Sequence, residues 1–162
     1  MTDMQASVQT SADGPSGIGG WLILPVLGLV ATPLRGIFHL ASYGEMLQSM
    51  DQLTRGQIAF IVVEFIGNAI VLLVMPIALL VLLFRKSASF PRWFIVWAAV
   101  GLAFIILDIA AAQIFFGDVL AAAGQALLDA DTMRELVRSI VLAAIWIPYM
   151  RVSRRVANTF VN

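Results

Sequence analysis

The chain has 162 residues, of which 60% are hydrophobic and 12% are charged, and its 10 basic and 10 acidic residues leave no net charge. Soluble domains are about 45–50% apolar and about 25% charged, so this composition indicates an integral membrane protein. The balanced charge excludes the basic surface of a nucleic-acid-binding protein, and the lack of cysteine with a single histidine excludes disulfides and a Cys- or His-rich metal site.

The first 18 residues are polar and include Asp3 and Asp13, but no lysine or arginine. A secretory signal peptide begins with a basic segment, so the chain is not expected to start with one. Residues 1–18 are therefore predicted to be a disordered polar tail, and the apolar stretch after them is predicted to be a membrane helix.

Four apolar stretches follow this tail, and a spanning helix needs about 20 mostly apolar residues. The fold class predicted is an all-α, integral membrane four-helix bundle within residues 19–152. The predicted spans cover residues 20–40, 58–84, 91–116 and 133–150.

Several residues mark the ends of these helices. Ser89 followed by Pro91 is typical of the start of the third helix. Thr132 and Glu135 have the spacing of a capping box, which places the start of the fourth helix near residue 133. Gly117 and the aspartate after it are expected to end the third.

Two features of the first two spans indicate helix packing. Gly28, Thr32 and Gly36 form a series of small residues that permits close approach of another helix. Pro33 and Pro76 lie inside spans, where each removes a backbone hydrogen bond and is expected to kink its helix.

Basic residues concentrate on one predicted side of the membrane. They are Arg85, Lys86 and Arg92 between the second and third spans, and Arg151, Arg154 and Arg155 after the fourth. Because cytoplasmic loops carry an excess of lysine and arginine, both termini are predicted to face the cytoplasm. Residues 153–162 are accordingly predicted to be a basic cytoplasmic tail, whose arginines also meet anionic lipid headgroups.

Each predicted span carries one charged side chain in its outer half. Glu64 lies in the second span, Asp108 in the third, and Arg35 and Arg138 in the first and fourth. At about 1.5 Å per residue, Glu64 is roughly 9 Å and Asp108 roughly 12 Å below the outer helix ends. A charge at the bilayer centre costs about 2.5–3.5 kcal/mol on insertion scales, so these residues are expected to form a neutral layer that faces other helices.

Two interpretations of this charge layer are open. The charges could form buried ion pairs that fix helix register, because a guanidinium pairs well with a carboxylate. They could instead line a polar vestibule, open to the outside, that binds an ion or polar solute or carries protons. Asn68, one turn from Glu64, and His39 are its polar neighbours. His39 is expected to be solvated at the headgroup level, with a proton relay beside Arg35 as the alternative.

The sequence contains little that indicates catalysis. It has no GxSxG, HExxH, P-loop or GxGxxG motif. Glu64 and Asp108 could form a pair of carboxylates, but no nucleophile or set of metal ligands accompanies them. The chain is therefore not expected to be an enzyme or to hold a cofactor or metal.

The two ends of the apolar region carry the most recognisable residues. GGWLILP at residues 19–25, and WIPY at 146–149 with SRRVANTF at 153–160, resemble the domain of unknown function 2569 family. The Phe90–Arg92 entry to the third helix, Glu64, and Leu107 with Asp108 are also similar to that family. The resemblance covers residues 17–161 and implies a four-helix protein of the bacterial inner membrane, but no activity.

The function expected from these features is that of a non-enzymatic accessory or structural membrane protein acting through helix packing. Besides the lipid bilayer, its partner would be another membrane protein or further copies of the chain in a homo-oligomer. The alternative is a small oligomeric transporter or channel component that uses Glu64 and Asp108. Nucleic acid is not an expected partner.

Overall fold

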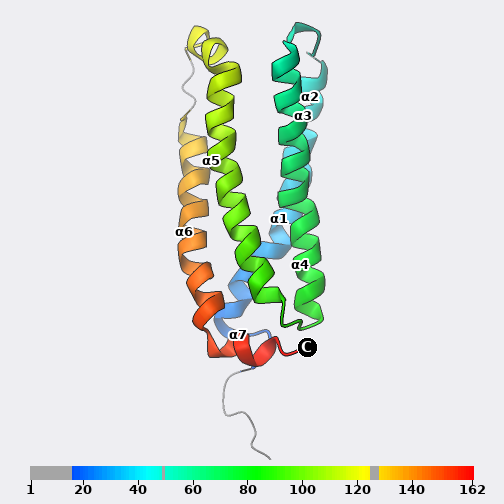
Figure 1. The fold of residues 1–162 in the computed structure, drawn as a ribbon, viewed down its shortest axis with the longest axis vertical. Coiled ribbons are helices and arrows are strands. Elements are labelled where there is room, and N and C mark those ends of the chain that lie inside the picture. Colours follow the sequence, from blue (N-terminus) through cyan, green and yellow to red (C-terminus); the bar gives the residue numbers. More distant parts are fainter. Residues whose placement is uncertain (1–15, 49, 125–127) are drawn as a thin grey trace, which may run out of the picture.

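The structure is a computed structural model that describes residues 16–48, 50–124 and 128–162, and all regular elements in these ranges are helical (Figure 1). The all-α prediction is thus confirmed. The elements in chain order are η1 (Gly20–Leu22), α1 (Ile23–Ala41), α2 (Tyr43–Gln48), η2 (Met50–Gln52), α3 (Arg55–Ala69), the π-helical turn η3 (Ile70–Val74), α4 (Met75–Phe84), α5 (Phe90–Ala122), α6 (Ala130–Val152) and α7 (Arg154–Thr159).

Three helical segments are long and apolar enough to cross a membrane. They are Gly20–Ala41, Arg55–Phe84 and Phe90–Ala122, and they contain the first three predicted spans. Helix α6 covers the fourth predicted span and has 23 residues, a sufficient length. Its first turns carry several charged side chains, so α6 is less apolar than the other three segments.

Helix α5 is longer than predicted at its C-terminal end. It continues through Gly117 and ends at Ala122. A glycine inside a helix costs only about 1 kcal/mol relative to alanine, and no proline follows to stop the helix. The stop is Gly124, whose φ of 67° is the left-handed conformation that commonly ends helices.

Helix α6 begins earlier than predicted. Its N-cap is Asp129, whose Oδ1 accepts a hydrogen bond from the backbone N–H of Thr132 at 2.7 Å. This bond holds the pKa of Asp129 below its usual value. The predicted capping box of Thr132 and Glu135 is therefore wrong, and Glu135 is left to bond elsewhere.

The helices form two associated groups in the bundle. Helices α5 and α6 lie side by side along α6, and α1 packs against η3 and α4 (Figure 1). Gly36 makes the second contact close, because a Cβ atom built on it would lie 2.8 Å from Leu72 Cβ. Gly28, by contrast, has nothing within 4 Å of such a Cβ atom, so only part of the predicted small-residue series is used inside the chain.

The turn η3 leaves one backbone carbonyl without a backbone hydrogen-bond donor, and a side chain of α5 supplies the donor. Met75 N–H bonds to Ile70 in the π-helical manner, and Pro76 has no N–H, so neither residue donates to the carbonyl of Val71. The indole Nε1 of Trp97 donates to that oxygen at 2.9 Å. A tryptophan N–H thus replaces the lost backbone donor and ties α5 to the second span.

The tightly packed core lies at the end of the bundle that holds α7 and the connection between α4 and α5. Phe90 and Phe160 stack there with ring centroids 4.5 Å apart. The core draws residues from η1, α1, α4, α5, α6 and the C-terminal segment. Its buried members are Leu22, Leu29, Leu79, Leu83, Phe90, Phe94, Met150, Val156 and Phe160.

The C-terminal residues are more ordered than the predicted tail at 153–162. They form α7, which places Val156, Thr159 and Phe160 in buried positions across the end of the bundle (Figure 1). The predicted N-terminal tail lies outside the described residues up to residue 15. Gly17 N–H donates to Thr159 Oγ1 at 2.9 Å, which joins the two ends of the bundle region.

Candidate functional site

A cluster of polar side chains joins α2 to α3. The phenol of Tyr43 donates to Glu64 Oε1 at 2.6 Å, and Asn68 Nδ2 donates to Tyr43 Oη at 3.1 Å. Glu64 and Asn68 are one helical turn apart and so reach the same neighbour. Tyr43 is only 5% exposed, and its ring packs edge-on against His39 and Phe65. We call Tyr43, Glu64 and Asn68 the tyrosine cluster.

The electrostatics of the tyrosine cluster favour a protonated phenol. Burial, reinforced by the hydrogen bond to Glu64, raises the pKa of Tyr43 above its usual value. The O–H therefore remains available as a donor, and Glu64 is the acceptor. Asp108 on α5 is half-buried and within electrostatic reach of both Glu64 and Tyr43. Over the described ranges its carboxylate accepts no hydrogen bond.

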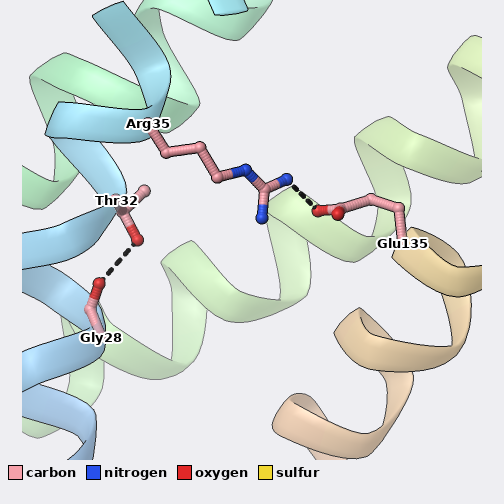
Figure 2. Close-up of polar contacts among 4 residues, drawn as sticks. All are labelled: Gly28, Thr32, Arg35 and Glu135. Atoms are coloured by element: carbon pink, nitrogen blue, oxygen red, sulfur yellow. Dashed lines mark hydrogen bonds and ion pairs between the residues drawn. The ribbon is translucent and has the colours of Figure 1, made fainter. Parts of the chain in front are cut away.

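An ion pair links α1 to α6. Arg35 Nη2 lies 2.5 Å from Glu135 Oε1, and the two side chains are 51% and 39% exposed. Figure 2 shows the pair extending between the two helices in front of α5. One turn below Arg35, the hydroxyl of Thr32 bonds back to the Gly28 carbonyl at 2.8 Å, so it does not compete for the guanidinium. We call Arg35 and Glu135 the ion-pair bridge.

One interpretation of the charge layer has Arg35 and Arg138 pairing with Glu64 and Asp108. The structure shows different partners. Arg35 pairs with Glu135 because α6, not α3, presents an acid to this face of α1. Glu64 bonds to Tyr43 instead. Arg138 is exposed and forms no ion pair with any residue that the structure describes.

Two members of these sites were not identified as site residues from the sequence. Tyr43 could have been found, since a buried tyrosine needs a partner for its hydroxyl, and Glu64 and Asn68 form a polar face for it. The spacing of Glu135 from Thr132 predicts a capping box and gives no sign of an ion pair with Arg35. His39, predicted to be solvated, is exposed beside Tyr43.

The basic residues that predict the orientation in the membrane lie at the opposite end of the bundle from the tyrosine cluster. Most are exposed, but Arg155 is half-buried, with its guanidinium over the backbone of Gly19 and Gly20. We call this set the basic end. Its members are Arg85, Lys86, Arg92, Arg151, Arg154 and Arg155.

The chemistry available differs between these sites. The ion-pair bridge neutralises itself, whereas the carboxylates of Glu64 and Asp108 offer oxygen atoms that can take up a proton or contact a cation. Over the described residues, no group of three or more His, Cys, Asp or Glu side chains could hold a metal ion.

Comparison with known proteins decides the family. The family described as "Protein of unknown function (DUF2569)" matches residues 15–161. The chain belongs to this family. Among relatives, the inner membrane protein YdgK of Escherichia coli (strain K12) is 29% identical over 154 residues, which cover 91% of this chain and 96% of that protein. No solved structure matches significantly.

The family assignment confirms the resemblance found in the sequence. Together with the apolar helices, it makes this DUF2569 member a multi-pass inner-membrane protein whose helices contact the lipid bilayer. The two terminal motifs that carried the resemblance meet in space. Gly17, just before the first motif, bonds to Thr159 in the second, and Arg155 of the second covers Gly19 and Gly20 of the first.

Proposed function

We propose that this chain is a non-enzymatic accessory or structural protein of the inner membrane, which acts by packing against another membrane protein or a second copy of itself. The observation that carries the proposal is the exposed ion-pair bridge. Arg35 and Glu135 are 51% and 39% exposed, and at 1.5 Å per residue they lie about 9 Å and about 8 Å inside the outer ends of α1 and α6. At 1.5 Å per residue, Glu135 is about 24 Å from Arg151, which places it in the outer part of a hydrocarbon layer of about 30 Å.

Charges at this depth need a polar environment on their open side. Exposure to lipid would cost roughly 2.5–3.5 kcal/mol for a charge at the bilayer centre on insertion scales, and less toward the headgroups. The neighbours of the ion-pair bridge on the helix surfaces are exposed apolar side chains, among them Leu34, Phe38 and Val137. A polar contact within an apolar surround is typical of an interface between membrane helices. A protein partner is therefore the environment that best suits the bridge.

The proposal includes four spans with both termini in the cytoplasm. The hydrogen bond from Gly17 to Thr159 supports an even number of crossings, because it holds both ends of the bundle region on one side. Helix α6 supplies the fourth crossing beside α5. The basic end lies on that same side, which the positive-inside rule assigns to the cytoplasm.

The proposal is tested by neutralising the bridge. We expect Arg35→Gln alone, or Glu135→Gln alone, to reduce the yield of intact complex and its melting temperature more than the double variant does. Each single change leaves one uncompensated charge at the interface, whereas the double change removes both. The measurement is native mass of the complex in mild detergent, with a thermal unfolding curve for each variant.

Arg134→Gln is the matched control for these variants. Arg134 pairs with Asp131 on the surface of α6, and both side chains are well exposed. Such pairs contribute little, so both readouts should match the wild type. A double variant that is as damaged as the singles, in mass and in melting, would count against a role for the bridge in assembly.

A second candidate function is that of a small oligomeric transporter or channel component. It is favoured by Asp108, a half-buried carboxylate that is close to the tyrosine cluster and accepts no hydrogen bond from the described residues. Ionisable groups in membrane spans often mark ion or proton pathways.

This candidate predicts flux that depends on the two carboxylates. Wild-type protein in liposomes should move protons or monovalent cations down a gradient, and Glu64→Gln with Asp108→Asn should abolish the movement while the melting temperature stays unchanged. Flux assays with a pH-sensitive dye and an ion-selective dye measure both. Wild-type liposomes that are no leakier than empty ones would reject transport by the chain alone and leave the accessory role.

A further inference from the structure

The basic end combines several cations with no acidic side chain among the described residues beside them. The acidic side chains that the structure places lie toward the other end of the bundle or in its spans: Asp51, Glu64, Asp108, Asp118, Asp129, Asp131 and Glu135. Only two ion pairs occur over the described ranges, and neither uses a residue of the basic end. This end of the described bundle is therefore strongly positive and needs an anionic environment.

Exposed aromatic residues place the basic end at the level of lipid headgroups. Trp21 is 73% exposed and follows Gly20 directly, and Trp93 is 51% exposed and follows Arg92. Tryptophan side chains favour the boundary between hydrocarbon and headgroups. The adjacent cations then lie in the layer that contains the lipid phosphates.

One cation of the basic end is positioned by the fold and not by an acid. A Cβ atom on Gly19 would lie 3.1 Å from Arg155 Nη1, and one on Gly20 would lie 3.4 Å from Arg155 Cζ. The two glycines thus make room for a guanidinium against the backbone. The hydrogen bond between Thr159 and Gly17 fixes α7, and hence Arg155, in this place. The guanidinium forms no hydrogen bond or ion pair with the residues that the structure describes, so its donors remain free for an outside acceptor.

We propose that the basic end is a docking surface for the anionic phospholipid headgroups of the bilayer, with Arg155 as its positioned donor. A guanidinium can give two parallel hydrogen bonds to one phosphate, and the neighbouring arginines add attraction to the negative surface. This surface is separate from the ion-pair bridge and serves the protein whether it acts as an accessory protein or as a transporter.

The experiment measures thermal unfolding of the purified full chain in mild detergent after addition of lipid. Phosphatidylglycerol near saturation is expected to raise the melting temperature by about 5 °C, because a ligand that binds only the folded state stabilises it. Phosphatidylcholine and inorganic phosphate are each expected to leave it unchanged. Arg154→Gln with Arg155→Gln should lose at least half of the phosphatidylglycerol shift, measured against the variant's own baseline.

Two further variants keep the test decisive if loss of Arg155 disturbs the fold. Arg151→Gln with Arg154→Gln removes exposed charges that make no described hydrogen bond, and it should also reduce the shift. Arg134→Gln, at the other end of the bundle, should keep all of it. The proposal is overturned if phosphatidylcholine or inorganic phosphate gives the same shift, or if both basic-end variants respond like the wild type.

Discussion

Replacing Gly36 with alanine is expected to destabilise the fold by about 1–3 kcal/mol, the usual cost of overpacking a well-packed contact. The added Cβ would lie 2.8 Å from Leu72 Cβ and 3.3 Å from the Leu72 carbonyl oxygen. Neither atom is the flexible end of a side chain, so α1 itself must move away from η3. Unfolding of the purified protein in detergent, followed by helical circular dichroism, measures the loss.

Gly28→Ala on the same helix is the matched control. No atom lies within 4 Å of a Cβ built there, so this change should be neutral or stabilise α1 slightly through the better helix propensity of alanine. Equal stability for the Gly36→Ala and Gly28→Ala variants would show that the close contact between α1 and η3 does not exist in the folded protein.

Trp97→Phe is expected to cost a similar amount, about 1–3 kcal/mol, because it leaves the Val71 carbonyl without a donor. Phenylalanine keeps an aromatic ring at this position but cannot replace the indole N–H, which lies 2.9 Å from that oxygen. A carbonyl inside a membrane has no water to bond instead. The same unfolding assay gives the loss in stability.

Trp93→Phe, one turn earlier on α5, separates this effect from the general loss of a tryptophan. Trp93 is 51% exposed, and its indole makes no hydrogen bond with the described residues, so its replacement should change stability little. Restoring a regular backbone ladder with Pro76→Ala should also lessen the cost of Trp97→Phe. If the two tryptophan variants have the same melting temperature, Trp97 does not supply a stabilising hydrogen bond to the Val71 carbonyl.

The apolar segments and their approximate limits could be predicted because length and hydropathy decide them alone. The first three predicted spans coincide with long apolar helices, while α6 is recognisable as helix but not as apolar enough by itself. Pro76 indicated a kink, but the π-helical turn before it depends on Trp97, which lies on another helix. A contact between helices of this kind leaves no local pattern in either sequence segment.

The partners of the charged residues were harder to predict than their positions. The positions of Arg35 and Glu64 within apolar stretches are readable from the sequence, since a charge in such a stretch is conspicuous. Their partners, Glu135 and Tyr43, depend on the oblique course of α1 and on the place of α2, which periodicity does not determine. The sequence allows Glu135 to be either a capping residue or an ion-pair partner. The start of α6 at Ala130 decides between these roles, because it places Glu135 beyond the capping position.

Site-specific photo-crosslinking in native membranes tests the central claim, that the face bearing the ion-pair bridge is covered by protein. A photoreactive phenylalanine analogue at Phe38, one turn from Arg35 and 78% exposed, is predicted to give one discrete protein–protein adduct of higher mass. The same analogue at Leu107, 67% exposed on α5, is predicted to react with lipid. Lipid adducts alone at both positions would contradict the claim.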